Sequence, residues 1–157
     1  MLEAADAPPP GPVDVDSSYV SRDPYTDVPV ASCERRGTES GVSTLTVLEV
    51  RVADTPAQAS EVQAKHLDNR YPPGTRIRKV TTDAGPAYVV DLGGTPTAPW
   101  RSRAIQVVVG PYELHLNALA GVTEKRPYGQ WADVEDLVAA ADELAASLGS
   151  EGESDVP

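Results

Sequence analysis

The sequence contains no phenylalanine and only one cysteine, and both features narrow the possible folds and sites. Without phenylalanine, the core has to be built mainly from valine, leucine, isoleucine and alanine. Because Cys33 has no partner cysteine, an internal disulfide framework and a cysteine-rich metal site are excluded. We expect Cys33 to be a small buried hydrophobic residue, with a reactive thiolate beside Arg35 and Arg36 as the alternative.

Long apolar runs are absent as well. No segment approaches the ~18 apolar residues of a membrane span, so membrane insertion by this chain is not expected. Val30–Cys33 loosely fits a lipoprotein cleavage site, but residues 18–29 before it lack the apolar core of a signal peptide. We therefore reject that interpretation. Residues 1–10, which we expect to be disordered, would also suit a chain whose leader or anchor had been removed, so export stays open.

Basic residues are scarce toward both ends of the chain, which has a net charge of −11. Residues 1–42 carry three basic and eight acidic side chains, and residues 127–157 carry eight acidic and no basic ones. Such a chain would be repelled by nucleic acids and by anionic membranes, so neither is expected as a partner. The simplest interpretation of the acidic ends is that they keep the protein soluble.

The composition divides the chain into three parts. Residues 1–19 are a Pro- and Asp-rich segment that we expect to be a disordered arm, and residues 149–157 a disordered acidic tail. Residues 20–148 remain as a single α+β domain with one modest core.

Alternating and β-branched segments predict an antiparallel sheet of about five to six strands, covered on one face. Gly110-Pro111 is spaced for a tight hairpin in which glycine supplies a positive φ. The segments expected as strands are 25–32, 42–52, 76–82, 87–92, 103–109 and 112–120.

Two helices are predicted, one inserted after an early strand and one at the C-terminal end. Thr55 can cap the first, with Pro56 in its first turn and Gln58 completing a capping box, and the helix should run to about Arg70. The second, residues 133–148, has apolar residues at i, i+3, i+4 and i+7 spacing, so it should pack on the sheet. Gly149 is expected to end it.

No catalytic signature is present, and we predict that the protein is not an enzyme. Glu113 and His115 are the only candidates for acid–base chemistry. Their alternation with Leu114 and Leu116 predicts that they lie on an exposed strand face. His66 is expected on the helix face that lies over the sheet. Neither histidine has the nearby ligands of a transition-metal site, so no metal or other cofactor is predicted.

Two groups of charged residues are candidate binding surfaces. Arg76 and Arg78 share one strand face, as do Arg101 and Arg103, and together they could hold a small anionic ligand or a partner's carboxylates. The alternative is that they pair with the acidic last helix or face water. That helix offers the second surface, on which a basic protein partner could bind; its acidic residues are Asp133, Glu135, Asp136, Asp142 and Glu143.

Several segments between residues 42 and 148, a region of about two-thirds of the chain, together resemble a known group of protein domains. They are residues 83–88 (DAGPAY), residues 103–110 (RAIQVVVG) with residues 112–114 (YEL), and the Ala-rich closing helix. The pattern resembles small extracytoplasmic lipoprotein and sensor domains of high-GC Gram-positive bacteria, some of which have a PsbP-like α/β/α sandwich. The resemblance implies a ligand- or partner-binding role rather than catalysis.

The first functional hypothesis is therefore a lipoprotein-like, non-enzymatic binding module of the bacterial cell envelope. The alternative is a cytoplasmic acidic interaction protein of the inhibitor, immunity or chaperone type that binds a basic partner.

Overall fold

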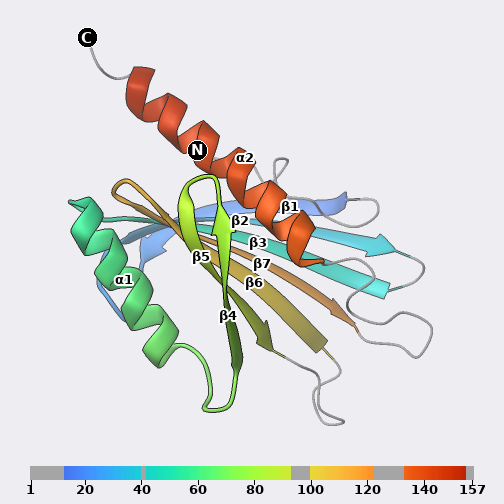
Figure 1. The fold of residues 1–157 in the computed structure, drawn as a ribbon. Coiled ribbons are helices and arrows are strands. Elements are labelled where there is room, and N and C mark those ends of the chain that lie inside the picture. Colours follow the sequence, from blue (N-terminus) through green and yellow to red (C-terminus); the bar gives the residue numbers. More distant parts are fainter. Residues whose placement is uncertain (1–12, 40–41, 93–99, 122–132, 155–157) are drawn as a thin grey trace.

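The computed structural model describes residues 13–39, 42–92, 100–121 and 133–154. They form one seven-stranded antiparallel sheet and two helices (Figure 1). The strands lie in the order β1-β2-β3-β7-β6-β5-β4. Their bounds are β1 (Val13–Arg22), β2 (Pro29–Glu39), β3 (Val42–Val52), β4 (Arg76–Thr82), β5 (Gly85–Leu92), β6 (Trp100–Val109) and β7 (Tyr112–Gly121).

The α+β class and the antiparallel sheet are confirmed, but the sheet has seven strands instead of about five to six. The additional strand is β1, which begins at Val13, inside the segment assigned to the arm. An edge strand needs only one partner, and β1 takes its backbone pairing from β2 alone. Its polar-rich sequence therefore carried little of the alternation that marks a buried strand.

Helix α1 (Pro56–Asn69) starts and ends where proline and glycine predict. The Thr55 side chain accepts a hydrogen bond from the Gln58 N–H (3.1 Å), and the Gln58 side chain accepts one from the Asp54 N–H (2.6 Å). The segment after the helix contains two prolines and Gly74, whose φ of +86° suits a residue without a Cβ. These local features fix where α1 begins and ends.

Helix α2 (Val134–Ser154) packs over β4, β6 and β7 through one apolar stripe. Leu137, Ala141, Leu144 and Leu148 are buried in the same core cluster as the central strands. The predicted packing is thus correct, but the helix continues past Gly149, where it was expected to end. Neither α1 nor α2, the helices among the described residues, is long and apolar enough to cross a bilayer.

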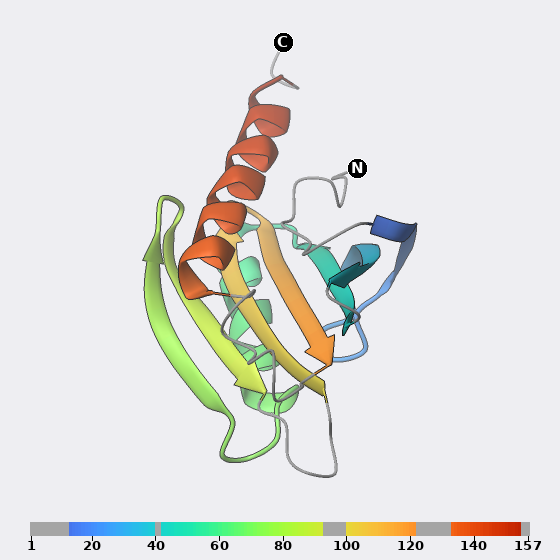
Figure 2. The same ribbon diagram turned by 90° about the vertical axis from the view of Figure 1, so that its right-hand side faces the viewer.

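The two helices lie on opposite faces of the sheet, so the expectation of a sheet covered on one face is wrong (Figure 2). The strand register makes these faces chemically different. Beneath α2 runs an apolar row across five strands, Cys33, Leu48, Leu116, Ile105 and Val89. The row next to it on the opposite face is polar, Ser32, Glu49, His115, Gln106 and Tyr88.

Candidate ligand pocket on the polar face

The polar face of the sheet is buried at its centre, contrary to the prediction for Glu113 and His115. Glu113 is 0% and His115 2% exposed. Alternation along β7 predicted that these side chains face water because their neighbours are apolar. Instead, α1 packs over this part of β6 and β7, and the polar side chains beneath it bond with one another.

Arg51 on β3 is the centre of this arrangement. Its guanidinium contacts three carboxylates that come from separate parts of the chain. Nε lies 3.1 Å from Asp23 Oδ1, Nη1 lies 2.9 Å from Glu113 Oε2, and Nη2 lies 2.6 Å from Glu49 Oε2. A buried guanidinium requires such paired and hydrogen-bonded partners, because its desolvation is otherwise uncompensated.

Asp23 reaches Arg51 because the β1–β2 loop folds back over the sheet. The Asp23 N–H donates to the Val28 carbonyl (2.9 Å), and the Asp27 N–H donates to the Asp23 carbonyl (2.8 Å). Asp23 Oδ2 accepts from both the N–H and the hydroxyl of Thr26, at 2.8 and 2.5 Å. The loop is therefore closed by its own backbone, and its first carboxylate is fixed in position.

A second branch of the network leads from Glu49 to the end of α1. Glu49 Oε2 lies 2.9 Å from Arg70 Nη1 and 3.2 Å from His115 Nδ1, in addition to its contact with Arg51. Arg70 Nη1 is also 2.9 Å from His115 Nδ1. Gln106 Nε2 donates to the Tyr71 hydroxyl (2.7 Å), so the polar face is connected as far as β6. We call the residues joined in these two branches the Arg51 network: Asp23, Glu49, Arg51, Arg70, Glu113 and His115.

The electrostatics favour charged Asp23 and Glu49. Burial alone would raise the pKa of Asp23, but its contacts with Thr26, His66 and Arg51 lower it to about 2. Burial also opposes ionisation of Glu49, yet its contacts with His115, Arg51 and Arg70 hold its pKa well below the usual range. Burial lowers the pKa of Arg51, but its contacts with Glu113 and Glu49 outweigh this effect and raise it.

The two histidines are held neutral by their surroundings. Burial, together with the charges of Arg70 and Arg51, lowers the pKa of His115 to about 4 in spite of Glu49. Burial and Arg51 likewise lower the pKa of His66. Both imidazoles are therefore neutral at physiological pH.

Burial raises the pKa of Glu113, although its partner Arg51 acts in the opposite direction.

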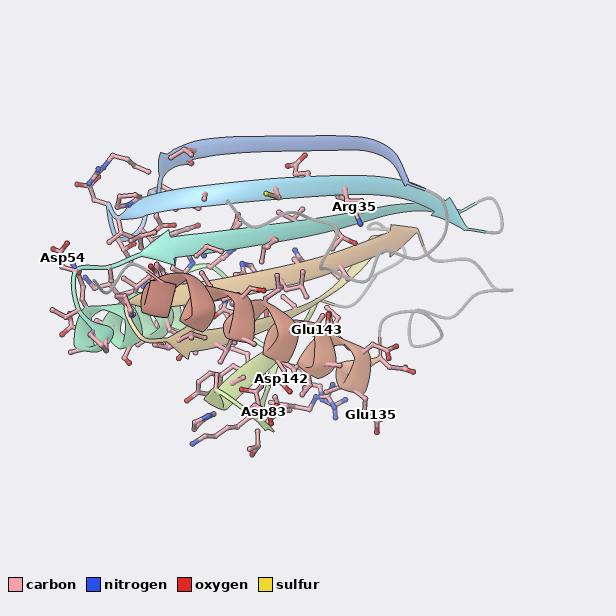
Figure 3. The ribbon with its side chains drawn as sticks, turned by 90° about the horizontal axis from the view of Figure 1, so that it is seen from above. Arg35, Asp54, Asp83, Glu135, Asp142 and Glu143 are labelled. Atoms are coloured by element: carbon pink, nitrogen blue, oxygen red, sulfur yellow. The ribbon has the colours of Figure 1, made fainter. Side chains whose placement is uncertain are left out.

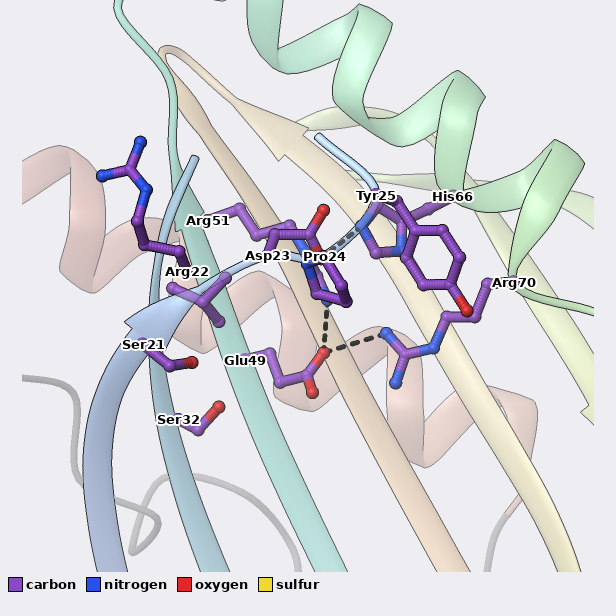
Figure 4. Close-up of a pocket in the computed structure, with 11 residues that line it drawn as sticks. Ser21, Arg22, Asp23, Pro24, Tyr25, Ser32, Glu49, Arg51, His66 and Arg70 are labelled. Carbon is purple, nitrogen blue, oxygen red and sulfur yellow. Dashed lines mark hydrogen bonds and ion pairs between the residues drawn. The ribbon is translucent and has the colours of Figure 1, made fainter. Parts of the chain in front are cut away.

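Beside this network lies a pocket of about 240 Å³ between the β1–β2 loop, β2, β3 and α1 (Figure 4). We call it the β1–β2 pocket. Glu49 and Arg51 belong to its β3 wall, His66 and Arg70 to its α1 wall, and Tyr25 to its loop wall. Its lining residues are Ser21, Arg22, Asp23, Pro24, Tyr25, Val30, Ser32, Glu49, Arg51, His66 and Arg70.

His66 is the least satisfied side chain in this wall. It is 0% exposed, and its Nε2 lies 2.9 Å from Asp23 Oδ1. Among the described residues, however, neither ring nitrogen has a partner with hydrogen-bond geometry. The ring packs edge-on against Tyr25, with 5.4 Å between the ring centroids. His66 does lie over the sheet, as its position in α1 suggested.

The predicted arginine cluster is only partly assembled by the fold. Arg78 Nη2 and Arg103 Nε converge on the two oxygens of Asp91, at 3.0 and 2.6 Å. These two arginines therefore bind a carboxylate of the protein itself and not one from a ligand. It belongs to Asp91 on β5, the strand between β4 and β6. Arg76 is exposed, and the side chain of Arg101 lies outside the described residues.

The acidic residues of α2 divide into two groups. Asp133, Glu135, Asp136 and Glu143 are exposed. Asp142 is half-buried and accepts a hydrogen bond from the Asp83 N–H (2.8 Å) in the β4–β5 turn, as Figure 3 shows. Asp142 therefore holds α2 to a hairpin.

The residues that line the pocket were missed from the sequence. Asp23, Glu49, Arg51 and Arg70 carried no motif, and Asp23 lies 28 residues from its partner Arg51. The one available signal was the pair of charged alternations, Glu49-x-Arg51 on one strand and Glu113-x-His115 on another. Complementary charges on two strands of one sheet indicate a buried ionic row when those strands are neighbours, but strand order was not predictable.

The described residues contain no group of three or more His, Cys, Asp or Glu side chains arranged to hold a metal ion. The guanidinium of Arg51 occupies the position between the carboxylates. No protein-family model, no curated protein and no solved structure matches this chain.

Proposed function

We propose that the protein is a non-catalytic binding module of the cell envelope and that the β1–β2 pocket is its ligand site. The observation that carries the proposal is a concave site whose walls are charged and prearranged by the Arg51 network. A few fixed polar groups in a concavity are what small-ligand sites have in common. The envelope part of the proposal is supported by the sequence resemblance to extracytoplasmic domains.

The burial of the two acid–base candidates supports a binding role over catalysis. Glu113 and His115 do not line the pocket, and each is engaged by an arginine within the network. A general acid or base must come within hydrogen-bond reach of a substrate. In the described conformation, a molecule in the pocket meets Glu49, Arg51, His66 and Arg70 instead.

The proposal is tested by screening small polar molecules against the isotope-labelled protein by NMR. We expect ligands to shift amide signals of the β1–β2 loop, β3 and the end of α1, and to be recovered chemically unchanged. Conversion of a bound molecule into a product would contradict the non-catalytic role. The absence of any pocket ligand in a broad screen would contradict the site.

The location is tested separately, by fractionating cells that express the native gene and sequencing the N-terminus of the recovered protein. Recovery in the envelope fraction is expected. Recovery in the cytoplasm alone would overturn the envelope assignment and leave the pocket assignment standing.

A second candidate function is binding of a basic protein through α2. The exposed Glu135, Asp136 and Glu143 favour it, since they extend an acidic surface along the helix. Such a complex should weaken steeply as salt is added, because exposed charges are screened. A salt-insensitive complex would count against this function.

A further inference from the structure

The free atoms of the pocket indicate which ligand it takes. Each of the three nitrogens of the Arg51 guanidinium already contacts a carboxylate of the fold. Within the described residues, by contrast, Glu49 Oε1 accepts no hydrogen bond, and Nε and Nη2 of Arg70 donate none. One carboxylate oxygen and the outer edge of one guanidinium are therefore available to recognise a ligand.

These two groups are in contact with each other. Arg70 Nη1 lies 2.9 Å from Glu49 Oε2, and Figure 4 shows the Glu49 carboxylate and the Arg70 guanidinium next to each other at the pocket wall. Arg70 is 27% and Glu49 17% exposed, so both can meet a ligand. The Glu49 carboxylate can accept a hydrogen bond from a cationic group of the ligand, and the Arg70 guanidinium can donate to an anionic group. Together they are complementary to a ligand that carries a cation and an anion close to each other.

The remaining wall is polar and the space is small. Ser32 and the unsatisfied, fully buried His66 ring offer further hydrogen bonds deeper in the pocket. A cavity of about 240 Å³ would hold about eight waters at ~30 Å³ each. It therefore suits a molecule or a chemical group of the size of a single amino acid.

From this geometry we infer that the β1–β2 pocket binds a free α-amino acid. The ligand ammonium group donates to Glu49 Oε1, and its carboxylate accepts from the outer edge of Arg70. A polar ligand side chain points toward Ser32 and His66. This inference rests on the proposed binding function and specifies its ligand class.

The test is NMR titration of the full chain with the free amino acids, followed by two analogues of the tightest one. One analogue lacks the ammonium group and the other lacks the carboxylate. We expect each analogue to bind at least about tenfold more weakly, the effect of losing one charged hydrogen bond. Equal binding of either analogue overturns the two-group recognition.

Substitutions at and away from the pocket test whether the amino acid binds there. Arg70→Met should weaken binding of the amino acid at least about tenfold, while Lys79→Met, the loss of a cation at an exposed position on β4, should leave it unaltered. Because Glu49 has three partners within the fold, Glu49→Gln is used only where its NMR spectrum remains that of the folded protein. An amino acid that binds Arg70→Met as tightly as the original chain overturns the inference.

The result also separates this inference from the proposed function. If no amino acid shifts pocket signals but another small molecule does, the ligand class is wrong and the binding role stands. If nothing in the broad screen binds at the pocket, both fail.

Discussion

At the residue scale, Arg51 has the largest structural consequence of any side chain described. It is the shared partner of Asp23, Glu49 and Glu113, which come from the β1–β2 loop, β3 and β7. Its removal would leave buried carboxylates without a counter-charge. Buried ion pairs contribute little relative to apolar packing, but removing one partner is strongly destabilising.

We therefore expect Arg51→Met to lower the free energy of unfolding by about 3–5 kcal/mol. Urea denaturation of the purified variant measures this. Arg76→Met, at an exposed position, is the matched control and should change stability by no more than about 0.5 kcal/mol. A cost for Arg51→Met as small as that of the control would show that the network is not coupled to the fold.

At the element scale, local signals fixed most of the secondary structure. Local geometry defines the ends of α1, through its prolines and capping residues, and the β6–β7 turn, through Gly110 with φ +55°. The apolar stripe of α2 is also visible within a short stretch of sequence. Such features can be identified without knowing the rest of the fold. β1 could not be identified in this way, because what defines it is its pairing with β2.

The pocket was unpredictable for a related reason. Its walls come from a loop, two strands and a helix, and the chemistry depends on which strands are neighbours. The Glu113 and His115 alternation was read correctly as placing both on one face. Whether that face meets water or a helix is decided by α1, which a local pattern does not reveal.

The α2 stripe gives a prediction at this scale. Leu144 is 0% exposed within the core cluster, so Leu144→Ala should cost about 2–5 kcal/mol through lost burial and the cavity left behind. Thermal or urea unfolding measures it. Ala146→Ser, an exposed position on the same helix, is the control and should have little effect. Equal stability of the two variants would mean that α2 does not pack as described.

At the scale of the whole molecule, the sheet separates two layers of different chemistry. Beneath α2 the strands present Leu48, Leu116 and Ile105, whereas beneath α1 they present Glu49, His115 and Gln106. Stability should therefore depend on pH mainly through the α1 layer, where the buried titratable groups lie.

The sign of this dependence follows from His115. Its pKa is about 4 when folded and ~6.5 when unfolded. Below pH ~6.5 the unfolded chain gains a proton that the folded chain resists. Stability is therefore greatest above that pH and falls as the pH is lowered toward about 4. At ~1.4 kcal/mol per pKa unit, His115 accounts for a loss of about 3 kcal/mol.

Urea unfolding at a series of pH values between about 7 and 4 measures this loss, and His115→Gln should flatten it. The slope that remains in the variant includes His66, whose pKa burial and Arg51 lower, and the opposite contribution of Glu113, whose pKa burial raises. A His115→Gln profile as steep as that of the original chain would contradict the assignment.

The difference between the two layers also bears on how the molecule opens. Helix α1 buries Ala59, Val62, Gln63 and His66, so two of its four buried side chains are polar. If it lifts away, water meets groups that hydrate well, and the leucine-rich layer on the opposite face stays dry. Detachment of α1 is thus a partial unfolding with a smaller heat-capacity change than detachment of α2, and the β1–β2 pocket is the part of the protein that it would uncover.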